Sequence, residues 1–370
     1  LGPAGTAEHA VERRPLEGPG ALEEGSARGL LHRRQAALGV GGALLGAEVA
    51  GAPARAELPA WANRAATGVK APDKAEELAA VQAGGPGFGR LSALQFSKLS
   101  KAAAIVKSQN LKANDESDLW GTMIEYHPEW LEEPKVGARV YANSGNALYR
   151  LGKPKKALQD YSLAISTDPT CGRLYVYRGI VLEELNRTDE AFADYAKGTE
   201  VDPNCAVAWA SKGTGLMARG NYPEAKEALL KGTELFNNKP TPSPDEARLD
   251  AALPWAGLPR GFFFCIVNLA VTEYEVGDTA SAQKRIDNLN AVMKDKPLAA
   301  AKAASALMVL ANKGGSSIGI VDFEAEKAWK QVEDIDYRWH KFSFASKSIQ
   351  WGPKLADALS ALRQNRFISA

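Results

Sequence analysis

Hydrophobic and small residues recur through the middle of the chain with a period of 34 positions, from about 138 to 238. In each copy an aromatic residue is followed by glycine four positions on and by leucine three positions later, one apolar stripe at helical spacing. A second stripe joins an alanine to a large apolar residue one turn on. The positions are Tyr141, Gly145, Leu148, Ala157 and Tyr161, then Tyr175, Gly179, Leu182, Ala191 and Tyr195, then Trp209, Gly213, Leu216, Ala225 and Leu229. This period predicts stacked pairs of helices.

Turn residues separate the two stripes of each copy. They are Gly-Lys-Pro at 152–154, Asn-Arg-Thr-Asp at 186–189 and Gly-Asn-Tyr-Pro at 220–223, which are typical of helix ends and tight turns. Asp168-Pro169 and Asp202-Pro203 are expected to end the second helix, because proline disfavours a helical conformation in the residue before it. Each copy is therefore predicted to be two antiparallel helices, with the glycine allowing close approach.

These copies resemble the tetratricopeptide repeat, whose pattern places a large residue, small residues, alanine, an aromatic, alanine and proline in this order. The resemblance implies an all-α, right-handed helical-repeat array that binds proteins and rarely catalyses. The pattern's leucine at position 7 is replaced by Ser144, Arg178 and Lys212, so altered packing is expected there.

Degenerate copies follow the three clear ones. A fourth fits the register at Leu269, Ala270, Gly277, Ala282, Ile286 and Leu289, and a weaker fifth depends on Ala325 and Trp329. The expected organisation is a leader at 1–56, a linker at 57–89, a helical cap at 90–133 with helices near 90–108 and 116–132, repeats 1–3 at 134–238, a proline-rich insertion at 239–260, degenerate repeats 4–5 at 261–350 and a capping helix at 351–370.

The N-terminal segment carries an export pattern. Arg33-Arg34 precedes an uncharged run, 36–47, whose glycines dilute its hydrophobicity, and Ala52-Pro53-Ala54-Arg55-Ala56 ends it with small residues. These features predict a disordered twin-arginine signal cleaved before Glu57. With the polar stretch 1–32, the leader resembles the two-part leader of thylakoid lumen proteins, although it is richer in glutamate than transit peptides are. The alternative is a disordered alanine- and glycine-rich tail with an incidental arginine pair.

The C-terminal residues resemble the tail of repeat proteins from cyanobacteria and plastids, where a tryptophan-proline-proline turn precedes a last helix. Here Trp351-Gly352-Pro353 has glycine in place of the first proline. Proline suits the first turn of a helix, so a capping helix is expected from Pro353. Its buried stripe is predicted to be Trp351, Leu355, Leu359 and Leu362.

Composition and candidate chemistry narrow the function classes. A net charge of +1 disfavours nucleic acid as a general partner, and no apolar run in the body of the chain predicts a transmembrane helix. Cys171, Cys205 and Cys265 form no metal-binding pattern and are interpreted as packing residues, with a redox link at Cys265 left open. No catalytic, metal or cofactor residues are predicted, so an enzyme is not expected.

The concave groove that the resemblance implies can be assigned to the first helix of each pair. Its predicted partner-binding residues are Arg139, Asn143, Asn146, Tyr149, Arg150, Arg173, Tyr177, Ile180 and Met217. Only Asn146 matches the clamp that co-chaperones use for a C-terminal carboxylate, whereas Val207 and Ser211 stand where cations are needed. The groove instead suits a segment with acidic and apolar residues. The alternative is that the arginines only solvate helix starts and the tyrosines only pack.

The insertion at 239–260 contains five prolines and Trp255. Long loops of this kind are functional or disordered, and Trp255 is the predicted anchor for a partner. The alternative is that the loop folds back over its own array.

The function expected from fold and leader together is a non-enzymatic protein-binding scaffold in the chloroplast thylakoid lumen, in assembly or maintenance of a photosynthetic complex. Its partners would be subunits of that membrane complex, with peripheral membrane association. The alternatives are a stably bound lumenal subunit of a photosystem supercomplex and an exported bacterial envelope repeat protein.

Overall fold

The computed structural model describes residues 87–108, 113–238, 241–255, 261–312, 323–348 and 351–366, which form helices and one isolated bridge between Phe88 and Leu91. The predicted leader at 1–56 and most of the predicted linker lie outside the described residues. The expectation of an all-α repeat array is confirmed. None of the described helices is both long enough and apolar enough to cross a membrane.

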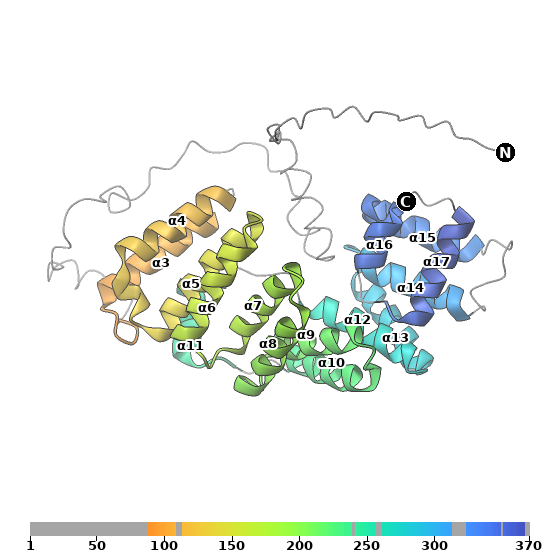
Figure 1. Cartoon of the computed structure of the whole chain (residues 1–370), viewed down its shortest axis with the longest axis horizontal. Helices are drawn as coiled ribbons and strands as arrows, with labels where there is room; N and C mark the ends of the chain where they lie inside the picture. The colour runs from red at the N-terminus through yellow and green to blue at the C-terminus, as the bar shows by residue number, and fades with distance from the viewer. Residues whose placement is uncertain are drawn as a thin grey trace, which may run out of the picture.

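Consecutive helices pack as antiparallel pairs along a curved array (Figure 1). The pairs are α5 (Pro134–Arg150) with α6 (Pro154–Thr167), α7 (Gly172–Glu184) with α8 (Thr188–Val201), α9 (Ala206–Ala218) with α10 (Tyr222–Asn237), α12 (Phe262–Glu275) with α13 (Thr279–Val292), and α14 (Ala299–Asn312) with α15 (Phe323–Ile335). The first helix of one pair also contacts the first helix of the next, so α5, α7, α9, α12 and α14 form a continuous inner layer.

Glycine sets the separation of the two helices in each clear repeat. A Cβ atom at Gly145, Gly179 or Gly213 would lie 2.9, 2.4 or 2.6 Å from the side chain that faces it on the second helix. Those side chains are the fully buried Tyr161, Tyr195 and Leu229. The large residue of the second helix therefore fills the space that the missing Cβ leaves.

The turns within the pairs share one backbone geometry. Gly152, Asn186, Gly220 and Gly277 all have positive φ, between 60° and 92°, and each is followed by a residue whose amide bonds back to the helix end. Glycine or asparagine accommodates this left-handed conformation without strain. Gly277 places the fourth pair in the same register as the first three.

The polar residues at position 7 of the repeat are used in bonds between the paired helices. Ser144 Oγ donates to Asp160 at 2.6 Å, and Arg178 donates twice to Asp194 at 2.7 and 2.8 Å. A charged hydrogen bond thus replaces the expected leucine contact. Lys212 instead lies over the ring of Trp209, at 5.2 Å.

The array is closed at each end by shorter elements. At the N-terminal end, α3 (Ala93–Ser108), α4 (Ala113–Tyr126) and the 3-10 turn η2 (Pro128–Leu131) pack over α5, so the second cap helix begins earlier and ends sooner than expected. At the C-terminal end lie η3 (Tyr337–His340), α16 (Phe342–Ser348) and α17 (Pro353–Arg366).

The predicted stripe of the capping helix is confirmed, since Leu355, Leu359 and Leu362 are buried and Trp351 packs against the same core. Glu275 of α12 accepts hydrogen bonds from the first amides of α17, those of Lys354 and Leu355. A Cβ at Gly352 would lie 2.2 Å from the Glu275 side chain. That contact leaves no room for a side chain at position 352 while Glu275 holds this position.

Replacement of Gly179 by alanine should lower the free energy of unfolding by about 1–3 kcal/mol, because the added methyl overlaps the buried ring of Tyr195. The control is Gly121→Ala on α4, where no atom lies within 4 Å of the added Cβ and alanine should stabilise the helix by up to about 1 kcal/mol. Urea unfolding of both variants measures the difference. Equal effects would show that the helices of a pair do not need this approach.

The three cysteines are free thiols, and burial raises the pKa of Cys205 to about 12 and of Cys265 to about 11. Since the thiolate is the reactive form, iodoacetamide should alkylate both very slowly at pH 8 in the folded protein and quickly in denaturant. Cys171, half-buried, should react first of the three. Mass spectrometry of timed samples measures this, and fast native labelling of Cys265 would contradict it.

Candidate partner-binding groove

Four of the predicted groove residues contact the same later segment of the chain. Arg139 and Asn143 lie on α5, and Arg173 and Tyr177 lie on α7, the next inner helix. All four contact residues 250–255. We call these four side chains the cradle. The alternative in which the insertion folds back over its own array is therefore what the structure shows for this stretch.

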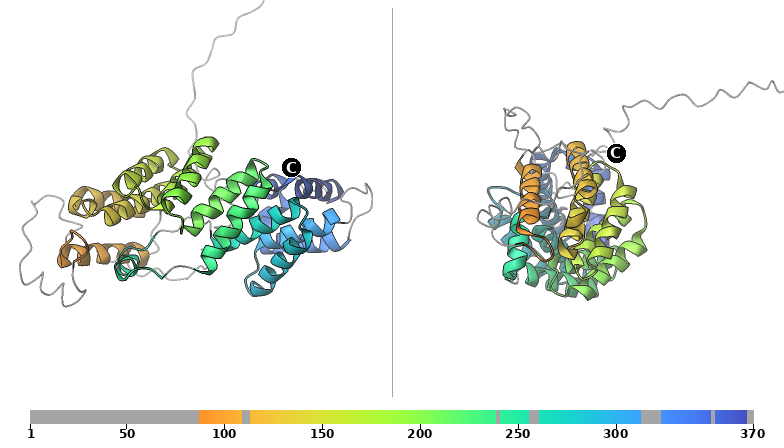
Figure 2. Two further views of the ribbon diagram at one scale, coloured as in Figure 1. Left: turned by 90° about the horizontal axis from the view of Figure 1, so that it is seen from below. Right: turned by 90° about the vertical axis from the view of Figure 1, so that its left-hand side faces the viewer.

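The insertion contains a helix that the sequence analysis missed, α11 (Pro244–Ala252). Ser243 Oγ accepts from the Glu246 amide, and the Glu246 carboxylate accepts from the Ser243 amide, a complete capping box. The signal was present as Ser-Pro-Asp-Glu, but the surrounding prolines obscured it. Seen from below in Figure 2, α11 lies beside α3, far from it in the sequence, and Arg248 of α11 donates to Gly87 O at 3.0 Å.

Arg139 is the centre of the cradle. Its Nη1 donates to Asp250 Oδ1 at 2.6 Å and to Leu253 O at 3.0 Å. The Arg139 side chain is 8% exposed, whereas that of Asp250 is 45% exposed. Burial lowers the pKa of Arg139, and the Asp250 carboxylate acts in the opposite direction. The buried guanidinium keeps a counter-charge only because the segment returns to it.

The backbone after α11 lies against α5 and α7. Asn143 Nδ2 donates to Pro254 O at 3.1 Å. The ring of Trp255 then lies 4.4 Å from the guanidinium carbon of Arg139 and 5.3 Å from that of Arg173. Tyr177 meets the same ring edge-on at 6.1 Å. Trp255 thus sits between two cations and an aromatic wall.

Burial of apolar side chains supplies most of the free energy that keeps residues 249–255 docked on the array. The polar contacts determine where the segment lies. Leu249 and Leu253 are fully buried in a cluster with Trp130, Val136 and α3. Burial of a leucine side chain is worth about 1.5–3 kcal/mol, whereas a cation–π contact contributes about 0.5–2 kcal/mol. The two leucines therefore outweigh the contacts of Trp255.

One donor of the cradle is left over. Arg139 Nε is buried and has no hydrogen-bond partner in the part of the chain that the structure describes. An arginine side chain can donate to both oxygens of a carboxylate at once, but Asp250 uses only Nη1. The segment therefore satisfies Arg139 incompletely.

The remaining predicted groove residues lie elsewhere. Asn146, Ile180 and Met217 are buried, and Asn146 Oδ1 accepts from Tyr161 OH at 2.9 Å, so these three offer no surface to a partner. Arg150 forms an ion pair with Glu116 of α4, and Tyr149 packs between two apolar clusters. A partner-binding role for any of the predicted residues stays a prediction.

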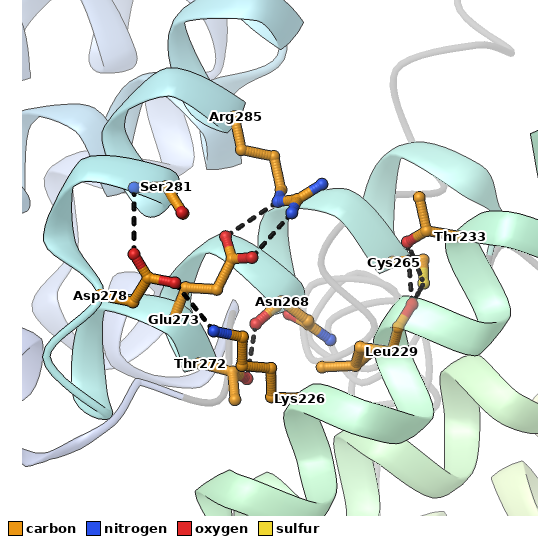
Figure 3. A network of polar contacts seen from close by, with 10 residues as sticks. All are labelled: Lys226, Leu229, Thr233, Cys265, Asn268, Thr272, Glu273, Asp278, Ser281 and Arg285. Atoms are coloured by element: carbon orange, nitrogen blue, oxygen red, sulfur yellow. Dashed lines mark hydrogen bonds and ion pairs between the residues drawn. The ribbon is translucent and has the colours of Figure 1, made fainter.

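A second hollow of about 480 Å³ lies between α10, α12 and α13. Its apolar wall is formed by Phe262, Phe263 and Ile266, with Lys284 exposed nearby. Figure 3 shows that Arg285, which also lines this hollow, donates through Nε and Nη2 to the two carboxylate oxygens of Glu273, at 2.8 and 2.7 Å. Among the described residues, no cluster of histidine, cysteine or acidic side chains could hold a metal ion.

Replacement of Asp250 by asparagine should release α11 locally, because buried Arg139 loses its counter-charge. We expect a cost of about 1–2 kcal/mol, below the 3–5 of a fully buried pair, because Asp250 is half-exposed. Trypsin should then cleave after Arg248 about 5–30 times faster. The control is Asp245→Asn on the exposed face of α11, and equal cleavage of the two variants would show that the ion pair does not hold the segment.

Comparison with known proteins supports the repeats themselves. The family model of the tetratricopeptide repeat matches residues 138–171 and again residues 172–205. No curated protein sequence matches the chain significantly.

Solved structures similar to this chain have low sequence identity to it. YrrB, described as a TPR protein with an unusual peptide-binding site, has a TM-score of 0.38 and 18% identity over 59% of this chain and 92% of its own. PilF of Pseudomonas aeruginosa has a TM-score of 0.40 and 15% identity over 63% of this chain and 94% of its own. A TPR repeat-containing protein of Cytophaga hutchinsonii, solved as its C-terminal part, has a TM-score of 0.40 and 13% identity over 73% and 97%.

At TM-scores this low, the likenesses indicate nothing about what this chain binds. The family matches are stronger, since they fall on the copies that α5 to α8 build, in the register set by the glycines. Residues 138–205 are therefore two consecutive tetratricopeptide repeats.

Proposed function

We propose that this protein is a non-enzymatic scaffold whose inner helices bind an extended segment of another protein. The observation that carries the proposal is the cradle, which already holds a stretch of polypeptide. Arg139 and Asn143 bind it through the backbone carbonyls of Leu253 and Pro254. Backbone carbonyls are common to all segments, so the same two donors suit a partner, and tetratricopeptide repeats bind proteins or peptides.

We further propose that it acts in the chloroplast thylakoid lumen, during assembly or maintenance of a photosynthetic complex. What supports this is the sequence, with the paired arginines, the weakly apolar run and the small residues before Glu57. The tail from Trp351 resembles that of plastid repeat proteins. The partners would be subunits of that complex.

The binding proposal is tested by affinity capture from solubilised thylakoids with residues 57–370 as bait. The double variant Arg139→Glu, Arg173→Glu should lose most of the captured proteins, because the cradle would repel acidic segments. The control is Lys197→Glu, Lys231→Glu, which makes the same change of charge at two exposed pairs on the second helices. Equal capture by both variants would remove the cradle from consideration.

The salt dependence of the wild-type capture separates two roles. Partners released by high salt indicate a transient scaffold, because exposed ion pairs are screened. A complete photosystem that survives the wash would make the protein a stable subunit instead. The location has its own test, since a lumenal chain should resist protease in intact thylakoids and begin near Glu57.

A further inference from the structure

We propose that residues 250–255 are a resident occupant of the cradle, which a partner segment of the same chemistry displaces. The inference rests on the proposed function and adds the kind of partner. That partner carries an acidic residue, a leucine three positions later and an aromatic residue two positions after that. These are the roles of Asp250, Leu253 and Trp255 in the resident segment.

The first step is the charge of the site. Arg139 and Arg173 belong to successive inner helices, and both face Trp255. Only Arg139 is paired with the segment's carboxylate. The cradle is therefore cationic on two sides, and it selects a segment with at least one acid.

The second step is the spacing of the anchors. Asp250 and Leu253 both reach Arg139, the first through its carboxylate and the second through its backbone oxygen, one turn of helix apart. The ring of Trp255 also lies against the same guanidinium group. The Leu253 side chain is buried in the N-terminal cluster, so a competing segment needs an acid, an apolar residue and an aromatic residue in this order.

The third step is that the occupancy is incomplete. Asp250 is half-exposed, and Trp255 is only partly buried. Arg139 Nε has no acceptor among the described residues. A partner segment whose carboxylate lies at the Nε edge of this guanidinium would satisfy that donor, which the resident segment leaves without a bond among the described residues. The resident segment keeps its place because it is tethered to the array, which raises its local concentration.

The test uses the full chain and a fluorescein-labelled peptide, SPDEARLDAALPW, the sequence of residues 243–255. Two proteins are compared by fluorescence anisotropy, the wild type and the variant Asp250→Ala, Trp255→Ala, in which the occupant has lost its acidic and its aromatic anchor. The variant should bind the peptide about tenfold or more tightly than the wild type, because the tethered competitor is weakened. A peptide with alanine at both anchor positions should bind the variant about tenfold or more weakly than the parent peptide does, because it keeps the two leucines but lacks the contacts with Arg139 and Arg173.

Two further variants control for folding. Trp255→Ala alone keeps the Arg139–Asp250 pair and should give an intermediate affinity. Adding Arg173→Ala to the double variant should abolish binding while the far-ultraviolet circular dichroism stays helical. If the double variant binds no tighter than the wild type, or binds the alanine peptide equally well, the proposal is wrong.

The outcomes are independent of the capture experiment. Peptide exchange without any captured protein would keep the resident occupant and remove the scaffold function. If proteins are captured through Arg139 and Arg173 but the peptide does not exchange, the scaffold function stands and the resident occupant is wrong. A concentration-dependent dimer of the wild type would make a second copy the occupant and overturn the assignment to a different protein.

Discussion

The structure depends on how closely the two helices of each pair approach. Gly145, Gly179 and Gly213 leave no room for a Cβ against the second helix, and a fully buried large side chain of that helix fills the gap. The period of 34 repeats this contact, so each pair has nearly the same shape and stacks on the next in the same way. The curvature of the array, and with it the inner layer of helices, follows from that repetition.

The inner layer carries a buried charge, that of Arg139, and a distant segment of the same chain supplies its partners. Arg139 lies on the inner face of α5 and is almost fully buried, although burial disfavours its charge. Water does not reach it well enough to replace a counter-charge, so Asp250 and the Leu253 carbonyl are brought to it by a segment more than one hundred positions away in the sequence. The insertion is thus part of the site, and its leucines are part of the N-terminal core.

Much of the fold could be predicted because the repeat is local. Spacing and residue type identify the helix pairs, the turns that contain Gly152 and Asn186 and the stripe of the capping helix. Spacing also selected Arg139, Asn143, Arg173 and Tyr177 as groove residues. Asn146, Ile180 and Met217, selected by the same spacing, are buried, because a repeat register gives the face of a helix but not what packs over that face. Spacing gave no position for α11, whose docking depends on contacts between distant parts of the chain.

The docked segment changes how affinity at this site should be understood. A partner does not meet an empty groove, so its apparent affinity is lowered by the fraction of molecules in which the cradle is open. Weak, merely acidic segments are then excluded, because they cannot replace the buried leucines and the tryptophan together. Only a segment that supplies all three anchors, or that also bonds to Arg139 Nε, which has no acceptor among the described residues, recovers the loss. The resident occupant therefore acts as a selectivity filter, at the cost of absolute affinity, without any change in the array that carries it.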